Sequence, residues 1–434
     1  MNVNPELSAV MSPARDLDQL GIPPGIVVDL IYRLLFSEGD VSVARFSDVI
    51  KVHAQALDII LARMKQEHMV EITNTGALGR FSYTYRLTEE GTRRAREAME
   101  RSQYLGPAPV SLENYRRALL HQSQTGRRVV PQDVQMGLRH LVLPDTFHRR
   151  IGPALNSGSS LFLYGPPGNG KTTIAEAIGR LLGDGEPIWL PYAITVGGQI
   201  IQIYDPLVHV KVEPSAEEEQ STARLSPGGP KVDKRWAQFR RPAVMVGGEL
   251  KMDALDLRFE PIAKFYEAPL QLKANGGMFL IDDFGRQQMP PQDLLNRWIV
   301  PLESGVDFLR LTSGQTIEIP FRQLIVFSTN LDPAELVDDA FLRRIQIKVE
   351  VEPPDDRLYY QIFQIICRQH DIPFDQPSFV HLLQNWYRKP QRAMQAVHPR
   401  DIIKIVAAIC EYEGLPRVLT PELVDEACMD YFVH

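Results

Sequence analysis

The chain has 434 residues, of which 44% are hydrophobic and 23% are charged, as is typical of globular proteins. This length predicts two or three domains. The net charge of −7 gives no support to generic binding of nucleic acid, because surfaces that bind phosphate backbones usually carry a strong basic excess.

Membrane and redox signals point to the cytoplasm. No apolar run reaches the roughly 20 residues that a membrane helix needs, and the first residues lack the basic-then-apolar order of a signal peptide. The three cysteines, Cys367, Cys410 and Cys428, lie far apart and match neither a zinc site nor a disulfide framework. We therefore expect a protein of a reducing compartment.

The first hundred residues predict a mobile segment followed by a small helical domain. Residues 1–24 are rich in proline and are expected to be mobile. Helical apolar spacing follows, and two strand-like runs separated by a glycine-containing turn at 74–79 predict a hairpin. The predicted helices span 26–36, 43–50, 53–68 and 88–101, and the predicted strands span 69–73 and 81–87.

These elements resemble a winged-helix domain over residues 25–104, and residues 85–91 resemble the wing-to-helix junction of bacterial winged-helix regulators. In such a domain the helix at 53–68 would be the one that reads DNA. A DNA-reading helix usually carries a dense set of basic and amide side chains. Here two acids interrupt four such side chains, so a protein-contact module is favoured and DNA binding is the alternative. The four are Gln55, Arg63, Lys65 and Gln66, and the acids are Asp58 and Glu67.

Residues 105–140 are predicted to be a linker that contains one amphipathic helix at 112–121. The linker closes with the sequence Gly126-Arg-Arg-Val-Val-Pro131. A new globular unit is expected to begin near Leu141.

A glycine-rich loop of the form GxxxxGKT follows an apolar strand at 161–164 and precedes a helix at 173–182, which is the context that this motif requires. Its backbone N–H groups and the positive end of the helix favour phosphate. Lys171 would reach the β- and γ-phosphates, and the Thr172 hydroxyl would ligate magnesium. The residues predicted to hold the nucleotide are Gly165, Pro166, Pro167, Gly168, Asn169, Gly170, Lys171, Thr172 and Thr173.

A second apolar strand, at 277–281, ends in two carboxylates. Asp282 matches the Walker B position, which holds magnesium through water. Asp283 falls where the base that polarises the attacking water would lie. Two acids at the end of a buried strand are costly unless they bind a cation, so the pair predicts a metal-dependent reaction.

Three later segments complete a pattern: a strand that ends in an amide at 323–330, an arginine pair within 339–344, and a helix start at 398–401. Together with the two earlier motifs, their order resembles AAA+ ATPases from about Leu141 to the C-terminus. The resemblance implies an α/β fold that uses ATP and Mg²⁺. Its core would be a P-loop parallel sheet over residues 141–354, with a small helical lid over residues 355–434.

The resemblance also implies roles for individual residues. Asn330 would act as sensor 1 and orient the hydrolytic water, and Arg400 would act as sensor 2 on the lid. Arg343 and Arg344 match the arginine finger, which reaches the γ-phosphate of a neighbouring subunit and can contribute about 10³–10⁵ in rate. One departure concerns Asp283, where most of the family has Glu, so turnover could be slow.

Two features narrow the type of AAA+ protein. Residues 308–319 read as strand, turn, strand just before the sensor-1 strand. This looks like the pre-sensor-1 hairpin of MoxR proteins, magnesium chelatase subunits and bacterial enhancer-binding activators, where it faces the ring pore; a plain surface hairpin is the alternative. A large β-rich insertion, at about 186–275, contains an acidic segment at 213–229 that is expected to be mobile. Strand-like runs lie at 200–204, 207–212, 243–247 and 265–272.

The lid is predicted to be helical, with helices at 357–370, 378–387, 400–412 and 421–432.

The favoured function is a ring-forming, hexameric remodelling ATPase that acts on a protein partner recruited by the winged helix. The whole chain also resembles bacterial AAA+ ATPases described as chaperone-like and linked to pilus assembly genes. The alternatives are a DNA-associated AAA+ regulator or loader, and a nucleotide-gated scaffold with slow hydrolysis, which Asp283 motivates.

Overall fold

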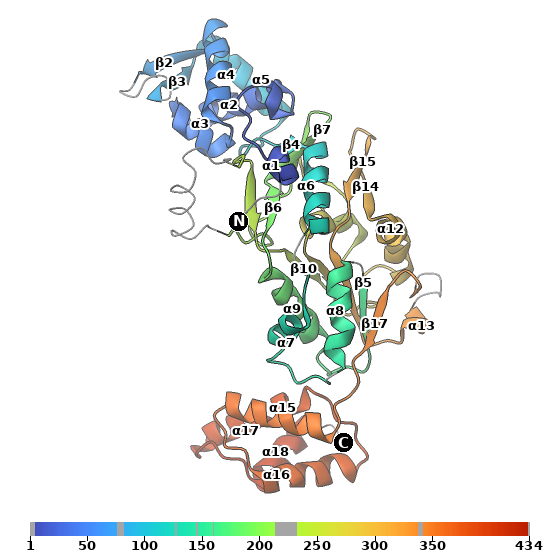
Figure 1. Ribbon diagram of the computed structural model, residues 1–434. Helices are drawn as coiled ribbons and strands as arrows, with labels where there is room; N and C mark the ends of the chain where they lie inside the picture. The colour runs from blue at the N-terminus through green and yellow to red at the C-terminus, as the bar shows by residue number, and fades with distance from the viewer. Residues whose placement is uncertain are drawn as a thin grey trace.

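The computed structural model of the chain describes residues 5–75, 82–125, 128–144, 146–158, 160–212, 232–336 and 342–432. Its parts follow one long axis (Figure 1). An N-terminal unit and a C-terminal helical unit lie at the two ends, and a β-rich part and a parallel sheet lie between them.

The N-terminal unit packs helices and a small antiparallel sheet, of order β1-β3-β2, around one apolar cluster. Side-chain caps set two helix starts, because Ser42 accepts from the Arg45 N–H at 3.2 Å and Thr88 accepts from the Gly91 N–H at 3.0 Å. The elements are α2 (Pro24–Glu38), β1 (Val41–Ser42), α3 (Val43–Ile50), α4 (Ala54–Gln66), β2 (Val70–Asn74), β3 (Thr84–Leu87) and α5 (Glu89–Arg101).

The helices and strands of this unit occur in the predicted order. The predicted turn at 74–79 lies mostly outside the described residues, which stop at Thr75 and resume at Ser82. The winged-helix resemblance stays a prediction.

The segment before α2 is packed and not mobile. Its helix α1 (Pro5–Val10) lies against α6 (Leu112–Thr125), and Met11 and Leu20 are each only 1% exposed. The expectation of a mobile segment over residues 1–24 is therefore wrong for its described part. The apolar side chains there are sparse, and they pack against residues far along the chain, so no local pattern marks them.

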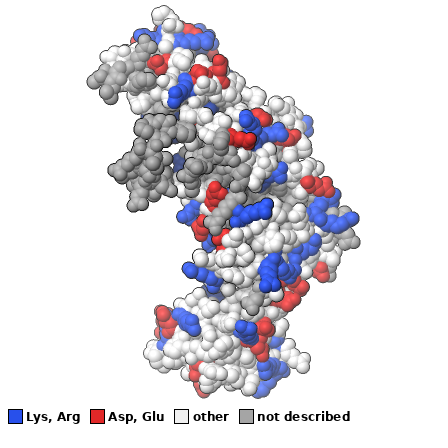
Figure 2. Space-filling view, viewed as in Figure 1, with Lys and Arg blue, Asp and Glu red and all other residues white. Residues whose placement is uncertain are grey.

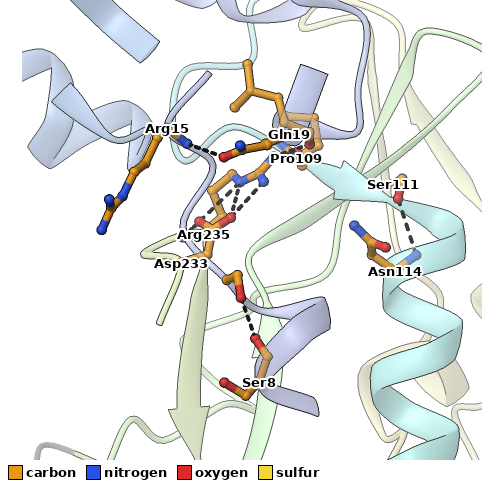
Figure 3. Close-up of polar contacts among 10 residues, drawn as sticks. Ser8, Arg15, Gln19, Pro109, Ser111, Asn114, Asp233 and Arg235 are labelled. Atoms are coloured by element: carbon orange, nitrogen blue, oxygen red, sulfur yellow. Dashed lines mark hydrogen bonds and ion pairs between the residues drawn. The ribbon is translucent and has the colours of Figure 1, made fainter. Parts of the chain in front are cut away.

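A buried ion pair joins this segment to the β-rich part (Figure 3). Arg235 and Asp233 are 3% and 6% exposed, and Arg235 Nη2 lies 2.7 Å from Asp233 Oδ2. Arg235 Nη1 also donates to the carbonyl oxygens of Leu20 at 3.1 Å and Pro109 at 3.2 Å. A guanidinium can be buried this deeply because both its charge and its N–H groups find partners.

The predicted insertion supplies most of a second sheet, of order β11-β12-β8-β7-β4, and a two-stranded antiparallel pair, β6 with β9. Most of its apolar residues form a second cluster, whereas Ala193 and Ile200 pack in the cluster of the N-terminal unit. The strands are β4 (Val110–Ser111), β6 (Ile188–Pro191), β7 (Ala193–Val196), β8 (Gln199–Gln202), β9 (Trp236–Phe239), β11 (Arg258–Glu260) and β12 (Phe265–Glu267).

The described residues of the region predicted to be a linker, 105–140, pack against the rest of the molecule. Its strand β4 pairs with β7, and α6 buries Tyr115 and Leu119 in the cluster of the β-rich part. The linker prediction is therefore wrong for the described residues, because this amphipathic helix packs against α1 and against strands of the insertion.

Two segments of the insertion differ from the strands predicted for them. Residues 207–212 form turns and a single bridge, and Leu207 is 93% exposed. The predicted strand at 265–272 ends at Glu267, and helix α11 (Leu270–Lys273) begins after Pro269. Proline has no N–H for a strand ladder and is favoured at helix starts, which accounts for the change.

The predicted hairpin before the sensor-1 strand is present as β14 (Val306–Arg310) and β15 (Thr316–Pro320), which pair antiparallel. One face is buried in the cluster of the β-rich part through Leu309 and Ile317. Phe308, on the other face, is 49% exposed. The hairpin is thus fixed to the molecule by one face, and its role in a pore stays a prediction.

The core is a five-stranded sheet of order β10-β13-β16-β5-β17 in which every neighbouring pair is parallel. Helices cover both faces, as an all-parallel sheet requires. The strands are β5 (Ser160–Tyr164), β10 (Ala243–Val246), β13 (Met278–Ile281), β16 (Leu324–Thr329) and β17 (Ile347–Glu350). One face carries α7 (Pro131–Gly137), α8 (Phe147–Ser157) and α9 (Lys171–Gly183), and the other carries η3 (Met252–Leu255), α11 and α12 (Pro291–Ser304).

This unit begins before Leu141, the predicted boundary. Helix α7 packs on α8 and α9, and it places Val134 and Leu138 in the buried cluster on that face of the sheet. The start is thus earlier than predicted, because a helix this short shows little periodicity.

The C-terminal unit contains α15 (Asp356–Gln369), α16 (Gln376–Leu382), the π-helical segment η4 (Leu383–Arg388), α17 (His398–Glu413) and α18 (Pro421–Tyr431). The four predicted helices are thus present, except that the second one widens into a π-turn that the sequence does not reveal. Asp355 and Thr420 cap α15 and α18. Within the described residues, no helix is long and apolar enough to cross a membrane.

Candidate active site

The glycine-rich loop connects β5 to α9 in a shape that suits phosphate. Gly165, Gly168 and Gly170 have positive φ angles of 132°, 76° and 84°, which favour glycine. A Cβ atom at Gly165 would lie 2.6 Å from the Val351 carbonyl oxygen, so no larger residue fits there. The loop therefore brings its backbone close to the N-terminal end of α9, where N–H groups favour anions.

Lys171, the first residue of α9, is 6% exposed and turns back onto the loop. Its Nζ donates to the carbonyl oxygens of Gly165 at 2.8 Å and Pro166 at 2.9 Å. Burial lowers the pKa of Lys171, and the carboxylates of Asp282 and Asp283 oppose that shift. The lysine thus provides a partly desolvated charge at the loop.

Thr172 and Asp282 meet although 110 residues separate them in the chain. The Thr172 hydroxyl donates to Asp282 Oδ2 at 2.9 Å, with Oδ1 at 3.1 Å. A hydroxyl and a carboxylate are hard oxygen ligands that suit Mg²⁺, which usually keeps water and phosphate oxygens as its other ligands. The described residues contain no group of three or more His, Cys, Asp or Glu that could hold a metal ion. The oxygen atoms of this pair fit a magnesium ion that takes its remaining ligands from water and phosphate.

Asp283 lies one residue past Asp282, with a positive φ of 49°. Its Oδ1 accepts a hydrogen bond from Asn330 Nδ2 at 3.1 Å. The Gln287 side chain holds the turn, since its Nε2 donates to the Asp282 carbonyl oxygen at 3.0 Å and to that of Asp283 at 3.2 Å. Because β16 lies between β5 and β13, Asn330 falls between the phosphate loop and the two acids.

The C-terminal unit contacts the loop through two hydrogen bonds donated by its backbone N–H groups, which we call the latch. The Val397 N–H donates to the Gly168 carbonyl oxygen at 2.9 Å, and the Ala396 N–H donates to Asn169 Oδ1 at 3.2 Å. Arg400, in the first turn of α17, has its Nε 2.9 Å from Asp401 Oδ1. This unit therefore supplies both a contact and a cation to the site.

These residues surround one cavity of about 610 Å³. Its lining includes Pro167 to Thr173 of the loop, both acids, Asn330 and Arg400. Gly165 and Pro166 are not among the lining residues, and their carbonyl oxygens accept from Lys171 Nζ. The structure therefore brings together most of the predicted site residues, from the loop, two strand ends and the C-terminal unit.

Sequence reasoning missed one wall of the cavity. Residues 140–143 and the α15 residues Ile362, Ile365 and Ile366 line it and make that wall mostly apolar, as suits a flat heterocyclic base. The α15 isoleucines have ordinary amphipathic spacing, and residues 140–143 fall at the predicted linker boundary. Neither pattern distinguishes a binding wall from core packing.

The predicted arginine finger lies apart from the cavity. Arg343 and Arg344 are not among its lining residues, and Arg344 Nε pairs with Glu303 Oε1 at 2.7 Å. The start of the predicted segment, residues 339–341, lies outside the described residues. Their role in a neighbouring subunit stays a prediction.

Comparison with known proteins gives little beyond this geometry. Residues 355–430 match a family described as a domain of unknown function (DUF8689). No curated protein matches the chain.

Solved structures show weak similarity. A crystal structure of NtrX from Brucella abortus is 12% identical, with a TM-score of 0.39, and the alignment covers 67% of this chain and 57% of that one. Two mutants of RuvB from Thermotoga maritima are each 13% identical, with TM-scores of 0.37. Those alignments cover 74% and 75% of this chain and 73% of each RuvB chain. The chain thus spans less than two thirds of NtrX, and TM-scores below 0.5 identify no activity.

Proposed function

We propose that this chain is a magnesium-dependent ATPase that binds ATP between the parallel sheet and the C-terminal unit. The convergence of Lys171, Thr172, Asp282, Asp283 and Asn330 on one cavity carries the proposal. Phosphoryl transfer to water depends chiefly on positioning and on cationic charge near the transferred group, and this site offers both.

Each side chain has a role that follows from its place. Lys171 would exchange its two loop carbonyls for phosphate oxygens, and Thr172 with Asp282 would hold magnesium, which neutralises phosphate charge when bound. Asp283, with its carboxylate held by Asn330, would accept a proton from the attacking water. Arg400 would reach the phosphates from the C-terminal unit.

Loss of phosphate release in Lys171→Ala tests the proposal. Lys404→Ala is a matched control, because Lys404 is an exposed lysine on α17 that does not line the cavity. We expect wild-type turnover in the control and at least a hundredfold loss in Lys171→Ala, the scale on which single charge-stabilising groups act. Equal turnover in both variants would refute the assignment.

We also propose that the active form is a ring of like subunits, of hexameric type, that remodels a protein partner. The position of Arg343 and Arg344 away from the cavity supports a finger supplied to a neighbour. Lys171→Ala subunits mixed with Arg343→Ala, Arg344→Ala double-mutant subunits should then recover activity, because some interfaces combine an intact loop with an intact finger. No recovery at any mixing ratio would argue against shared sites.

The partner is proposed to be a protein, recruited by the N-terminal unit. On the face shown in Figure 2, acidic and basic side chains lie side by side over that unit, without one continuous basic surface. On α4, Arg63 is already paired with Glu67 at 2.8 Å. Both observations support the protein-contact alternative over the DNA-reading one, and a link to pilus assembly has only the sequence resemblance behind it.

A further inference from the structure

Three buried polar side chains form a hydrogen-bonded chain across the C-terminal unit. Tyr359 lies on α15, Tyr387 in the π-helical segment η4, and His398 at the first position of α17. The hydroxyl oxygens of Tyr359 and Tyr387 are 2.6 Å apart, and the Tyr387 hydroxyl lies 2.9 Å from His398 Nδ1. The three side chains are 0%, 3% and 6% exposed.

Burying this hydrogen-bonded network of three polar side chains costs free energy that apolar side chains in the same places would not. Each polar group loses water, and only the mutual hydrogen bonds compensate for it. Burial lowers the pKa of His398 to about 4, so near neutral pH its ring is uncharged and Nδ1 can accept a hydrogen bond from the Tyr387 hydroxyl. A buried hydrogen-bonded network favours one arrangement of its elements over others, so it constrains how α15, η4 and α17 meet.

The His398 end of the hydrogen-bonded network lies next to the latch. His398 directly follows Val397, whose N–H donates to the Gly168 carbonyl oxygen at 2.9 Å. Two residues later, Arg400 lines the cavity. At its other end, the network is anchored on α15, the helix that supplies the apolar wall. None of the three network residues lines the cavity itself.

We propose that the chain Tyr359–Tyr387–His398 positions the latch over the phosphate loop and thereby sets the affinity for nucleotide. Its effect on affinity rests on the proposed function, whereas its effect on the latch does not. The network residues are positioning residues, since they act through residues 396–400 and touch no ligand.

A simpler alternative is that the network only stabilises the C-terminal unit. Tyr387→Phe and Tyr360→Phe separate the two readings. Tyr360 lies beside Tyr359 on α15, and its hydroxyl accepts from Gln364 Nε2 at 2.8 Å within the same helix. Both variants delete one tyrosine hydroxyl in the same unit, but only Tyr387→Phe breaks the path to the latch.

Amide hydrogen exchange on the full chain without nucleotide is the first measurement. In Tyr387→Phe, the amides of Ala396 and Val397 should exchange about tenfold faster, the scale of one net hydrogen bond. Amides inside α17, such as that of Val406, should keep their wild-type rates. Unchanged rates at 396–397, or a uniform increase through the whole unit, would overturn the positioning role.

Binding of a fluorescent ATP analogue is the second measurement. We expect about a tenfold weaker Kd in Tyr387→Phe and His398→Leu, and a near wild-type Kd in Tyr360→Phe. His398→Asn should restore binding, because its Oδ1 can accept where Nδ1 does. A looser latch with unchanged Kd would overturn the link to affinity. If wild-type protein bound no nucleotide, the proposed function would fail, and the exchange data would still decide the positioning role.

Discussion

The side-chain amide of Asn330 donates to Asp283 Oδ1 at 3.1 Å, which joins the ends of two neighbouring parallel strands at the edge of the cavity. Strands β13 and β16 pair in parallel as far as Ile281 and Phe327, and Asp283 and Asn330 lie just beyond these paired ends. The Phe284 N–H adds a bond of 2.7 Å to the Ser328 carbonyl oxygen. The carboxylate is therefore aimed by the backbone and by the amide, as a general base needs to be.

Asp283→Asn should lower the rate of ATP hydrolysis by about 10²–10⁴ while nucleotide still binds, because it removes the proton acceptor and keeps the shape. The Asn oxygen can still accept from Asn330. Phosphate release and nucleotide titration measure the two effects. Asp332→Asn is the control, since Asp332 is an exposed acid just past β16 that does not line the cavity. Full activity in Asp283→Asn would assign the base role elsewhere.

Arg235→Ala should destabilise the protein by about 3–5 kcal/mol, since it leaves the buried Asp233 carboxylate without its counter-charge. It also removes the donor to Leu20 and Pro109. Arg240→Ala is the control, because its pair with Asp184, at 3.4 Å, joins two exposed side chains and should contribute at most about 1 kcal/mol. Urea unfolding followed by circular dichroism compares the two. Similar losses would show that burial of the Arg235 pair is unimportant.

The C-terminal unit should lose stability as the pH falls below 6.5. Burial lowers the pKa of His398 from 6.5 to about 4, so the unfolded chain binds this proton first. The cost is absent above pH 6.5, grows as the pH falls, and reaches about 3 kcal/mol near pH 4. Nearby Arg392 strengthens the shift and Asp401 opposes it.

Hydrogen exchange in α17 measured between pH 7 and pH 4 reports this loss, after correction for intrinsic exchange. His398→Asn has no titrating ring, so the difference between wild type and variant isolates this group from carboxylates that also titrate. Parallel pH profiles in the two proteins would contradict the prediction.

Gly168→Ala should weaken the contact between the phosphate loop and the C-terminal unit. The added Cβ would lie 2.4 Å from Gln395 Oε1 and 3.0 Å from Val397 Cγ1, at a φ of 76°. Gly170→Ala is the control, because Gly170 has a similar φ of 84° and an added Cβ there would have no atom within 4 Å. It therefore introduces the backbone strain of about 1–3 kcal/mol without a steric clash. Faster amide exchange at Val397 in Gly168→Ala only is the expected result. Equal effects would assign the change to strain.

Much of the site could be predicted because its functional side chains lie at, or just after, the ends of strands. Lys171, Thr172 and Asp282 each follow or end an apolar run that only a buried strand explains, and parallel strands bring such ends to one edge. The apolar wall could not be predicted in this way. Ile362 and Ile366 have the same spacing as residues that merely pack a helix, and only tertiary position distinguishes them.

The largest errors concern partners that are distant in the chain. Tyr115 and Met11 are both buried in the cluster that the insertion forms. Because these partners are distant in the sequence, the helix around Tyr115 was predicted to be part of a linker and the segment around Met11 was predicted to be mobile. At 207–212, apolar residues suggested a strand. However, the Asp205 carboxylate accepts from the Leu207 N–H at 3.0 Å and starts a turn instead.

In the proposed function, phosphate oxygens would compete with the loop carbonyl oxygens for the Lys171 ammonium when the nucleotide binds. The Lys171 Nζ already donates to two carbonyl oxygens, at 2.8 and 2.9 Å, and phosphate oxygens would replace them as acceptors. A strongly charged ligand would therefore displace the loop carbonyls more readily than a weakly charged one. Polyanions should be selected over monoanions even at equal size, and the affinity lost on Lys171→Ala should understate the strength of the direct contact.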